Sequence, residues 1–193
     1  MDMEQRLNAK LAPESVAATL MRAGCFLSAY ELIKPQIIDS VHDFFWCGFK
    51  GGAHVYNEDQ YARNVLWLGA NKYLASCAWL VKMDALTDEQ VATLAEIRTH
   101  RNEVAHELPK LLVDPDFEVR TELLAEAVEI VRRLGVFWGS IEADTNPVFD
   151  DREIDYEGIK SGSCLLMEYL AAMVGVAERK EPDRHGGDQA PVQ

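Results

Sequence analysis

Residues 96 to 110, EIRTHRNEVAHELPK, combine groups that can hold a phosphate or move a proton with the apolar spacing of a buried helix. One helical stripe, with intervals of three and four, contains Leu94, Ile97, Arg101, Val104 and Leu108. An arginine in an apolar stripe is costly unless an anion, a carboxylate of another helix or a second subunit satisfies it. The pattern therefore indicates that Arg101 is met by a partner.

Two polar residues stand beside Arg101. Asn102 and His106 are four residues apart and share the adjacent helix face, whereas His106 lies roughly 140° around the axis from Arg101. Histidine is a common general acid or base, and arginine binds phosphates and stabilises their developing charge. The alternative is structural: Arg101 pairs with a carboxylate of another helix, and His106 is a core or helix-end histidine.

The other charged residues of this stretch are expected to form a solvated face. They are Arg98, His100, Glu103 and Glu107.

The residues RNEVAH resemble the signature of the HEPN superfamily: an arginine, a polar residue directly after it, and a histidine four to six residues beyond the arginine. The earlier stretch AGCFLSAYELIK is similar to the first helix of such domains. The resemblance implies an all-α, up-and-down bundle of about five helices that dimerises so that two motifs face one cleft. It also implies a metal-independent endoribonuclease without a cofactor, with Arg101 and His106 catalytic and Asn102 orienting His106 or contacting the phosphate.

The resemblance further implies an RNA substrate and a homodimer. By analogy with the family alone, the setting is a toxin–antitoxin or antiviral defence system, in which an antitoxin or other regulatory protein is a further partner. The net charge of -13 departs from this expectation, because so acidic a protein repels long polyanions. Three explanations of this charge stay open: the substrate is small or structured RNA, a basic partner protein binds the chain, or the chain has no catalytic activity. The competing interpretation is a non-catalytic dimerisation, nucleotide-binding or RNA-binding module.

Length and composition predict one folded domain. The 193 residues, 48% of them hydrophobic, suffice for a single core over residues 1–178, and residues 179–193 have almost nothing to bury and are expected to be disordered. The four cysteines, Cys25, Cys47, Cys77 and Cys164, include no C-x-x-C pair and suggest reduced thiols. The N-terminus lacks a signal-peptide core, and CLLMEYLAAMVGVA is too short to span a bilayer. We expect a cytoplasmic protein without membrane contact.

Helices should dominate, and strands should be absent or marginal. We expect a first helix over 15–45, kinked or divided at Pro35, and a second from an Asn57 cap to about Met83. A third is capped by Thr87 in a box with Gln90 and ends near Pro109. A fourth spans about 116–139, an acidic loop follows (about 141–155, with acidic residues to 157), and a fifth helix covers about 156–178.

Other groups of residues give weaker indications of a functional site. A metal site from His42, Cys47 and His54 has spacings that fit no common zinc pattern, and GFKGG reads as a turn. Aromatic residues of HDFFWCGF and at four later positions could stack bases, but aromatics at helical spacing are usually core or interface. The later four are Tyr61, Trp67, Tyr73 and Trp79.

Overall fold

Helix α2 (Pro13–Asp43) is the central element of the computed structural model, which describes residues 2–150 and 152–176. Pro13 stands in its first turn, where the missing N–H costs nothing. Pro35 lies inside the helix, which continues to Asp43, so of the two predicted effects of Pro35, a kink or a division, the division is wrong. A proline inside a helix costs about 3 kcal/mol. The fully buried Ile33 and Ile37 on either side of it show how tertiary packing offsets that cost.

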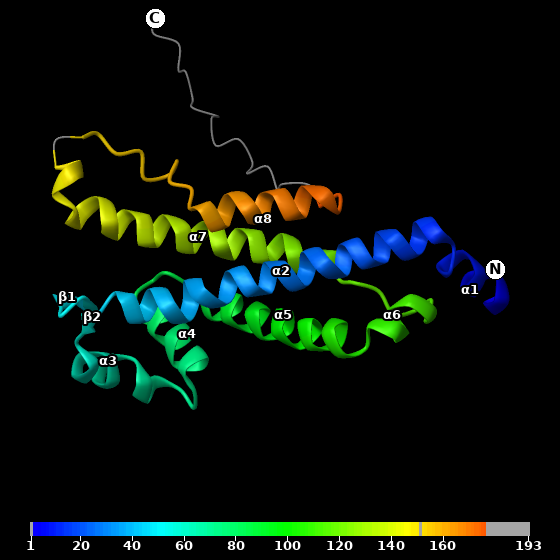
Figure 1. The fold of residues 1–193 in the computed structure, drawn as a ribbon, viewed down its shortest axis with the longest axis horizontal. Coiled ribbons are helices and arrows are strands. Elements are labelled where there is room, and N and C mark those ends of the chain that lie inside the picture. Colours follow the sequence, from blue (N-terminus) through cyan, green and yellow to red (C-terminus); the bar gives the residue numbers. More distant parts are fainter. Residues whose placement is uncertain (1, 151, 177–193) are drawn as a thin grey trace, which may run out of the picture.

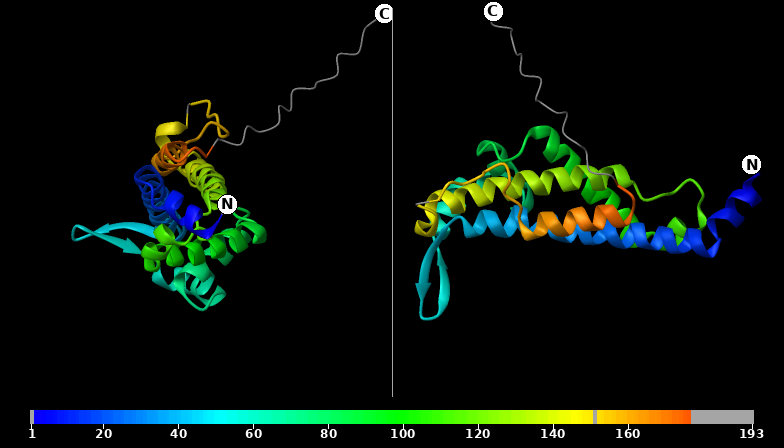
Figure 2. Two further views of the ribbon diagram at one scale, coloured as in Figure 1. Left: turned by 90° about the vertical axis from the view of Figure 1, so that its right-hand side faces the viewer. Right: turned by 90° about the horizontal axis from the view of Figure 1, so that it is seen from above.

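Four helices form the main packing partners of α2, and the short helices at the ends of the bundle add smaller contacts (Figure 1). The four main partners are α4 (Lys72–Lys82), α5 (Asp88–His106), α7 (Thr121–Thr145) and α8 (Gly162–Met173). The views in Figure 2 show the long helices side by side, with α8 over the pair α2 and α7. Their shared core includes Phe26, Leu80, Leu94, Leu134 and Met167, each almost inaccessible to solvent. The chain is mostly helical, as predicted.

Capping residues set where several helices begin. Thr87 and Gln90 form the predicted capping box of α5. Asn57 caps as predicted, but its helix is only α3 (Glu58–Asn64), followed by the 3-10 helix η1 (Leu66–Leu68) and then α4. The chain turns at Gly69, where an added Cβ would lie 2.5 Å from the backbone nitrogen of Ala75. This close approach explains why the single long helix is wrong.

The later helices differ from prediction mainly at their ends. Helix α5 ends at His106, and Pro109 stands in the first turn of a further short helix, α6 (Leu108–Val113). Helix α7 starts later than expected and continues to Thr145, so it takes in part of the expected acidic loop. That loop is otherwise formed by the short η2 (Pro147–Phe149) and the segment before α8, which is shorter than predicted. The expected tail, 179–193, lies outside the described residues.

The first helix and the hairpin were not predicted. Helix α1 (Met3–Lys10) begins at a capping box formed by Asp2 and Gln5. Strands β1 (Trp46–Lys50) and β2 (Ala53–Tyr56) form an antiparallel hairpin. Its turn residues, Gly51 and Gly52, have φ of +60° and +82°, which glycine adopts without a steric cost and which match the twist of a two-residue hairpin turn.

Within the described ranges, α2 is the one helix long and apolar enough to cross a membrane by length and composition. A core helix meets the same test, and the buried side of α2 packs mainly against four other helices.

Candidate active site

Helix α5 has a face that packs into the bundle and a face that opens outward. Leu94, Ile97 and Val104 are buried, as the stripe predicts. Arg101 lies in the same stripe at its edge, with 31% of its side chain exposed. The apolar stripe thus anchors α5 and holds the arginine at the border between core and solvent.

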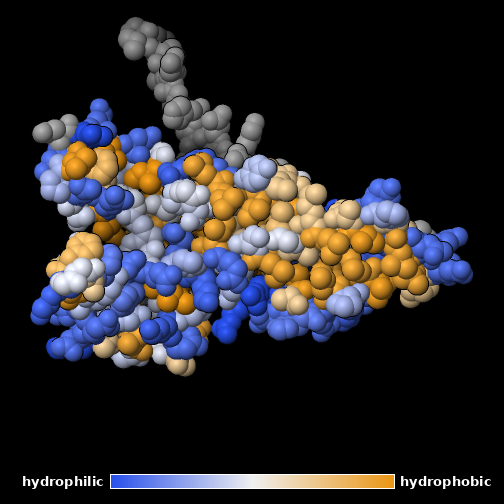
Figure 3. Space-filling model, in the orientation of Figure 1, coloured by the Kyte–Doolittle hydropathy of each residue, from blue (hydrophilic) through white to orange (hydrophobic). Residues whose placement is uncertain are grey.

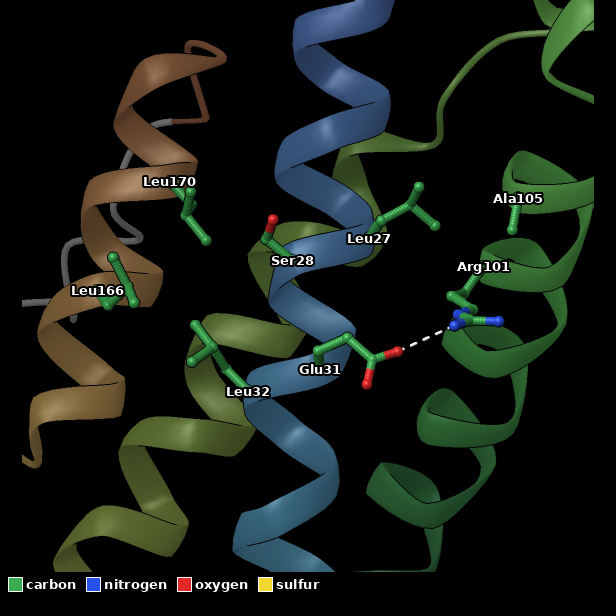
Figure 4. A pocket seen from close by; sticks show the side chains of 8 residues that line it. All are labelled: Leu27, Ser28, Glu31, Leu32, Arg101, Ala105, Leu166 and Leu170. Atoms are coloured by element: carbon green, nitrogen blue, oxygen red, sulfur yellow. Dashed lines mark hydrogen bonds and ion pairs between the residues drawn. The ribbon is translucent and has the colours of Figure 1, made fainter.

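Arg101 borders an open groove between α2, α5 and α8 (Figure 4). The Nη2 atom donates to Glu31 Oε1 on α2 at 2.9 Å, and the guanidinium carbon lies 5.3 Å from the centre of the Tyr30 ring. The groove holds about 510 Å³ and is otherwise mostly apolar. Its lining residues are Leu27, Ser28, Glu31, Leu32, Arg101, Ala105, Leu166 and Leu170. A carboxylate of another helix therefore meets Arg101, as the structural alternative predicts.

The pairing leaves Arg101 able to bind a further anion. Its Nη1 makes only a 3.4 Å contact to Asn102 Oδ1, and its Nε is buried without a hydrogen-bond partner among the described residues. Guanidinium has five N–H donors, so one carboxylate oxygen does not saturate it. Glu31 is 56% exposed and can swing into solvent when a phosphate takes its place.

His106 is the last residue of α5, and both His106 and Asn102 are exposed. Across the described ranges, the His106 side chain makes no hydrogen bond or ion pair, so its ring nitrogens are free to exchange protons with a substrate. The structure brings Arg101 and Asn102 together but does not join either to His106 within one chain. This agrees with the angular separation that helix geometry predicts.

His100 is buried, with 2% of its surface exposed, so the prediction that it lies on a solvated face is wrong. Its Nε2 accepts the backbone N–H of Arg120 at 2.9 Å, and its Nδ1 lies 3.0 Å from Glu103 Oε2. The ring meets the Phe26 ring edge-on, with centroids 5.0 Å apart. The segment before α7 folds over this side of α5 and covers it. The other charged residues of the predicted face, Arg98, Glu103 and Glu107, are exposed as expected.

Sequence reasoning missed Glu31 and the leucines opposite it. Glu31 was detectable as the lone carboxylate in the apolar stretch LSAYELIK. Its pairing with Arg101 was not, because the two residues are 70 positions apart and only the packing of α2 on α5 brings them together.

The aromatic residues and cysteines singled out in the sequence differ in how deeply they are buried. Tyr61 and Trp79 are core residues as predicted, whereas Trp67 is 70% exposed. In residues 2–150 and 152–176, no three His, Cys, Asp or Glu side chains are grouped to hold a metal ion. Of the four free cysteines, only Cys47 is exposed, and burial raises the pKa of Cys77 to about 11.

No protein-family model, curated protein or solved structure matches this chain. The likeness to HEPN domains rests on RNEVAH and its place in a helical fold.

Proposed function

We propose that this chain is a metal-independent endoribonuclease of the HEPN type that acts as a homodimer in the cytoplasm. One observation carries the proposal: Arg101 opens onto a solvent-accessible groove, while Asn102 and His106 are exposed on the last turns of the same helix. By contrast, His100 on the same helix is buried, and both of its ring nitrogens have partners. The toxin–antitoxin or antiviral setting, with its regulatory partner, is part of the same proposal.

An exposed apolar surface beside the groove supports the dimer. Figure 3 shows hydrophobic residues gathered over the first half of α2 and over α8. We call this surface the apolar face, and its large exposed members are Leu20, Met21, Leu165, Leu166, Tyr169 and Met173. Exposed apolar patches of this kind mark protein contacts, and a two-fold contact would use the same patch on both chains. Leu166 also lines the groove, so a second copy seated here would lie beside Arg101.

In this proposal, the two chains supply two arginines and two histidines to one cleft. Arg101 exchanges Glu31 for a phosphate of the RNA and stabilises the negative charge that grows on its oxygens. One His106 takes the proton of the 2′-hydroxyl, which attacks the adjacent phosphorus, and the other gives a proton to the departing 5′-oxygen. The products are a 2′,3′-cyclic phosphate and a 5′-hydroxyl.

The test compares purified wild type, His106→Ala and Arg101→Ala on a mixed cellular RNA pool with EDTA present. Loss of general acid–base catalysis should slow cleavage roughly 10²–10⁴-fold in His106→Ala. Arg101→Ala should also abolish cleavage. Arg98→Ala removes an exposed arginine of the same helix and serves as the matched control, with cleavage retained. Equal cleavage by wild type and His106→Ala would assign the activity to a contaminant or another site.

Light scattering tests the dimer. Wild type should have twice the chain mass of 21.7 kDa at micromolar concentration. Leu165→Glu with Tyr169→Glu places charge on the apolar face and should yield monomers that do not cleave. A wild-type monomer would contradict the two-motif cleft.

A second candidate function is a non-catalytic nucleotide-binding or RNA-binding module. The pairing of Arg101 with Glu31 favours it, because the cation is already neutralised in the free chain. Binding of RNA by wild type without cleavage of any RNA, with chelator or with added divalent cations, would select this candidate.

A further inference from the structure

The β1–β2 hairpin and the segment after it differ in chemistry from the rest of the chain. We propose that they bind unpaired bases of a single-stranded RNA. This inference rests on the proposed function. It names single-stranded RNA as the class of substrate that reaches the Arg101 groove. The hairpin face, its exposure, its charge and its place beside α2 each support it.

One face of the hairpin is a row of aromatic rings. Strand register pairs Phe49 with His54 and Trp46 with Tyr56, and a bulge between Trp46 and Gly48 keeps Trp46 and Phe49 on one side. Trp46 and Phe49 meet edge-on, with centroids 5.3 Å apart and ring planes at 75°, and Phe49 and His54 are tilted by 54° with centroids 4.6 Å apart. His54 and Tyr56 are nearly parallel, with centroids 6.3 Å apart. Flat aromatic surfaces in a row are what successive bases stack upon.

The hairpin is tied to the bundle only at its base. Tyr56 stacks on His42 with centroids 4.2 Å apart, and its hydroxyl donates to Asp43. Beyond this base, Phe49 is 66% and Trp46 is 46% exposed. Figure 2 shows the hairpin projecting away from the helices. These exposed rings are not part of the hydrophobic core. A two-stranded hairpin is only marginally stable in water by itself, so the rings do not make the hairpin an independent folding unit either.

The segment that contains the hairpin differs in charge from the rest of the chain. Residues 44–83, from the hairpin to the start of the α4–α5 turn, carry four cations and two acids, a formal charge of +2 in a chain of -13. The cations, Lys50, Arg63, Lys72 and Lys82, are all exposed, and none forms an ion pair with any described residue. Of the two acids, Glu58 is in contact with a histidine, its Oε1 lying 3.1 Å from His42 Nε2. The four unpaired cations can contact the phosphates of a strand that is bound at the hairpin.

The hairpin and the groove lie along the same helix. Glu31 precedes Asp43, the last residue of α2, by twelve residues, or about 18 Å along the helix axis. The left view of Figure 2 shows the hairpin leaving the bundle on the side that α2 forms. A few nucleotides of extended strand could thus pass from the rings to Arg101. A duplex, whose bases are already stacked, could not use the rings.

The binding test uses the His106→Ala chain, so that RNA stays intact, and measures fluorescence anisotropy of a labelled 12-nucleotide single strand and its duplex. The single strand should bind more tightly. Phe49→Leu keeps apolar bulk but loses the ring, and should weaken single-strand binding about tenfold, the effect of a stacking contact worth about 1.4 kcal/mol. Phe49→Tyr, which keeps a stacking surface, should bind like the parent. Val55→Ala removes a side chain of β2 that is not part of the ring row and is the control for the hairpin itself.

Equal binding by the Phe49→Leu and Phe49→Tyr chains, or equal affinity for single strand and duplex, would overturn the inference. Loss of self-association with unchanged RNA affinity would assign the hairpin to a protein contact and also overturn it. The proposed function is judged separately: a hairpin effect with a wild type that never cleaves would refute the nuclease alone. Cleavage that depends on His106 without a hairpin effect would refute the RNA-binding arm alone.

Discussion

Helix α5 carries two histidines six residues apart, and their surroundings differ completely. His100 is buried, both of its nitrogens have partners, and its ring packs against Phe26. His106 is exposed at the helix end, and its side chain makes no hydrogen bond or ion pair with any described residue. His100 therefore joins α5 to the segment before α7, whereas His106 on another face of α5 stays accessible to a substrate. Burial and partners, and not residue identity, separate a structural histidine from a reactive one.

The largest stability difference should lie between these two histidines. His100→Ala leaves a cavity beside Phe26 and strips the Arg120 N–H of its acceptor, and should lower the free energy of unfolding by about 2–4 kcal/mol. His106→Ala should change it by less than about 0.5 kcal/mol. Urea unfolding followed by circular dichroism measures both. His100→Phe keeps the ring packing and should recover part of the loss; equal losses at the two positions would remove the distinction.

A smaller effect should distinguish the half-buried carboxylate of α8, Glu168, from the exposed carboxylate of the groove, Glu31. Glu168 on α8 is 14% exposed and accepts from Lys160 Nζ at 2.9 and 3.0 Å, and this hydrogen bond lowers the pKa of its carboxyl. The folded pKa lies below the unfolded one, about 4.3, so the stabilisation is complete above that pH and is lost as pH falls through the folded pKa. Glu168→Gln should cost about 1.5–3 kcal/mol at pH 7.

Urea unfolding at several pH values checks this expectation. The difference between wild type and Glu168→Gln should shrink as the pH falls below about 4, because the wild-type carboxyl then becomes protonated as well. A difference that stayed constant from pH 7 to pH 3 would show that packing, and not charge, makes Glu168 matter.

The smallest stability effect should come from the outward face. Glu31 is 56% exposed, so Glu31→Gln should change the free energy of unfolding by less than about 1 kcal/mol. Freed of its carboxylate partner, Arg101 should bind RNA phosphate more tightly. Anisotropy in the His106→Ala chain measures the gain, and adding Arg101→Met should abolish it. A loss of stability above 2 kcal/mol would show instead that the pair mainly holds α2 to α5.

Local rules account for much of α5. Its capping box, its apolar stripe and the position of Arg101 within that stripe follow from the spacing of neighbouring residues and were predicted correctly. The hairpin was also within reach of local rules, because Gly51 and Gly52 separate two runs rich in β-formers. The aromatic run before them was instead taken for helix and turn. The helix break near Gly69 was also within reach of local rules, because Asn71 two residues later caps α4 by accepting the Leu74 N–H at 3.0 Å.

The sequence by itself determined a mainly helical chain and a helix that carries an arginine in its apolar stripe and an asparagine and a histidine on the adjacent face. Only the tertiary structure decided that Glu31 meets Arg101, that His100 and not His106 is buried, and that the aromatic hairpin stands clear of the core. The reason is the range of the interactions. Helix periodicity and caps act over three or four residues, whereas the partner of a charge and the burial of a ring depend on segments that meet across 20 to 70 positions of the chain.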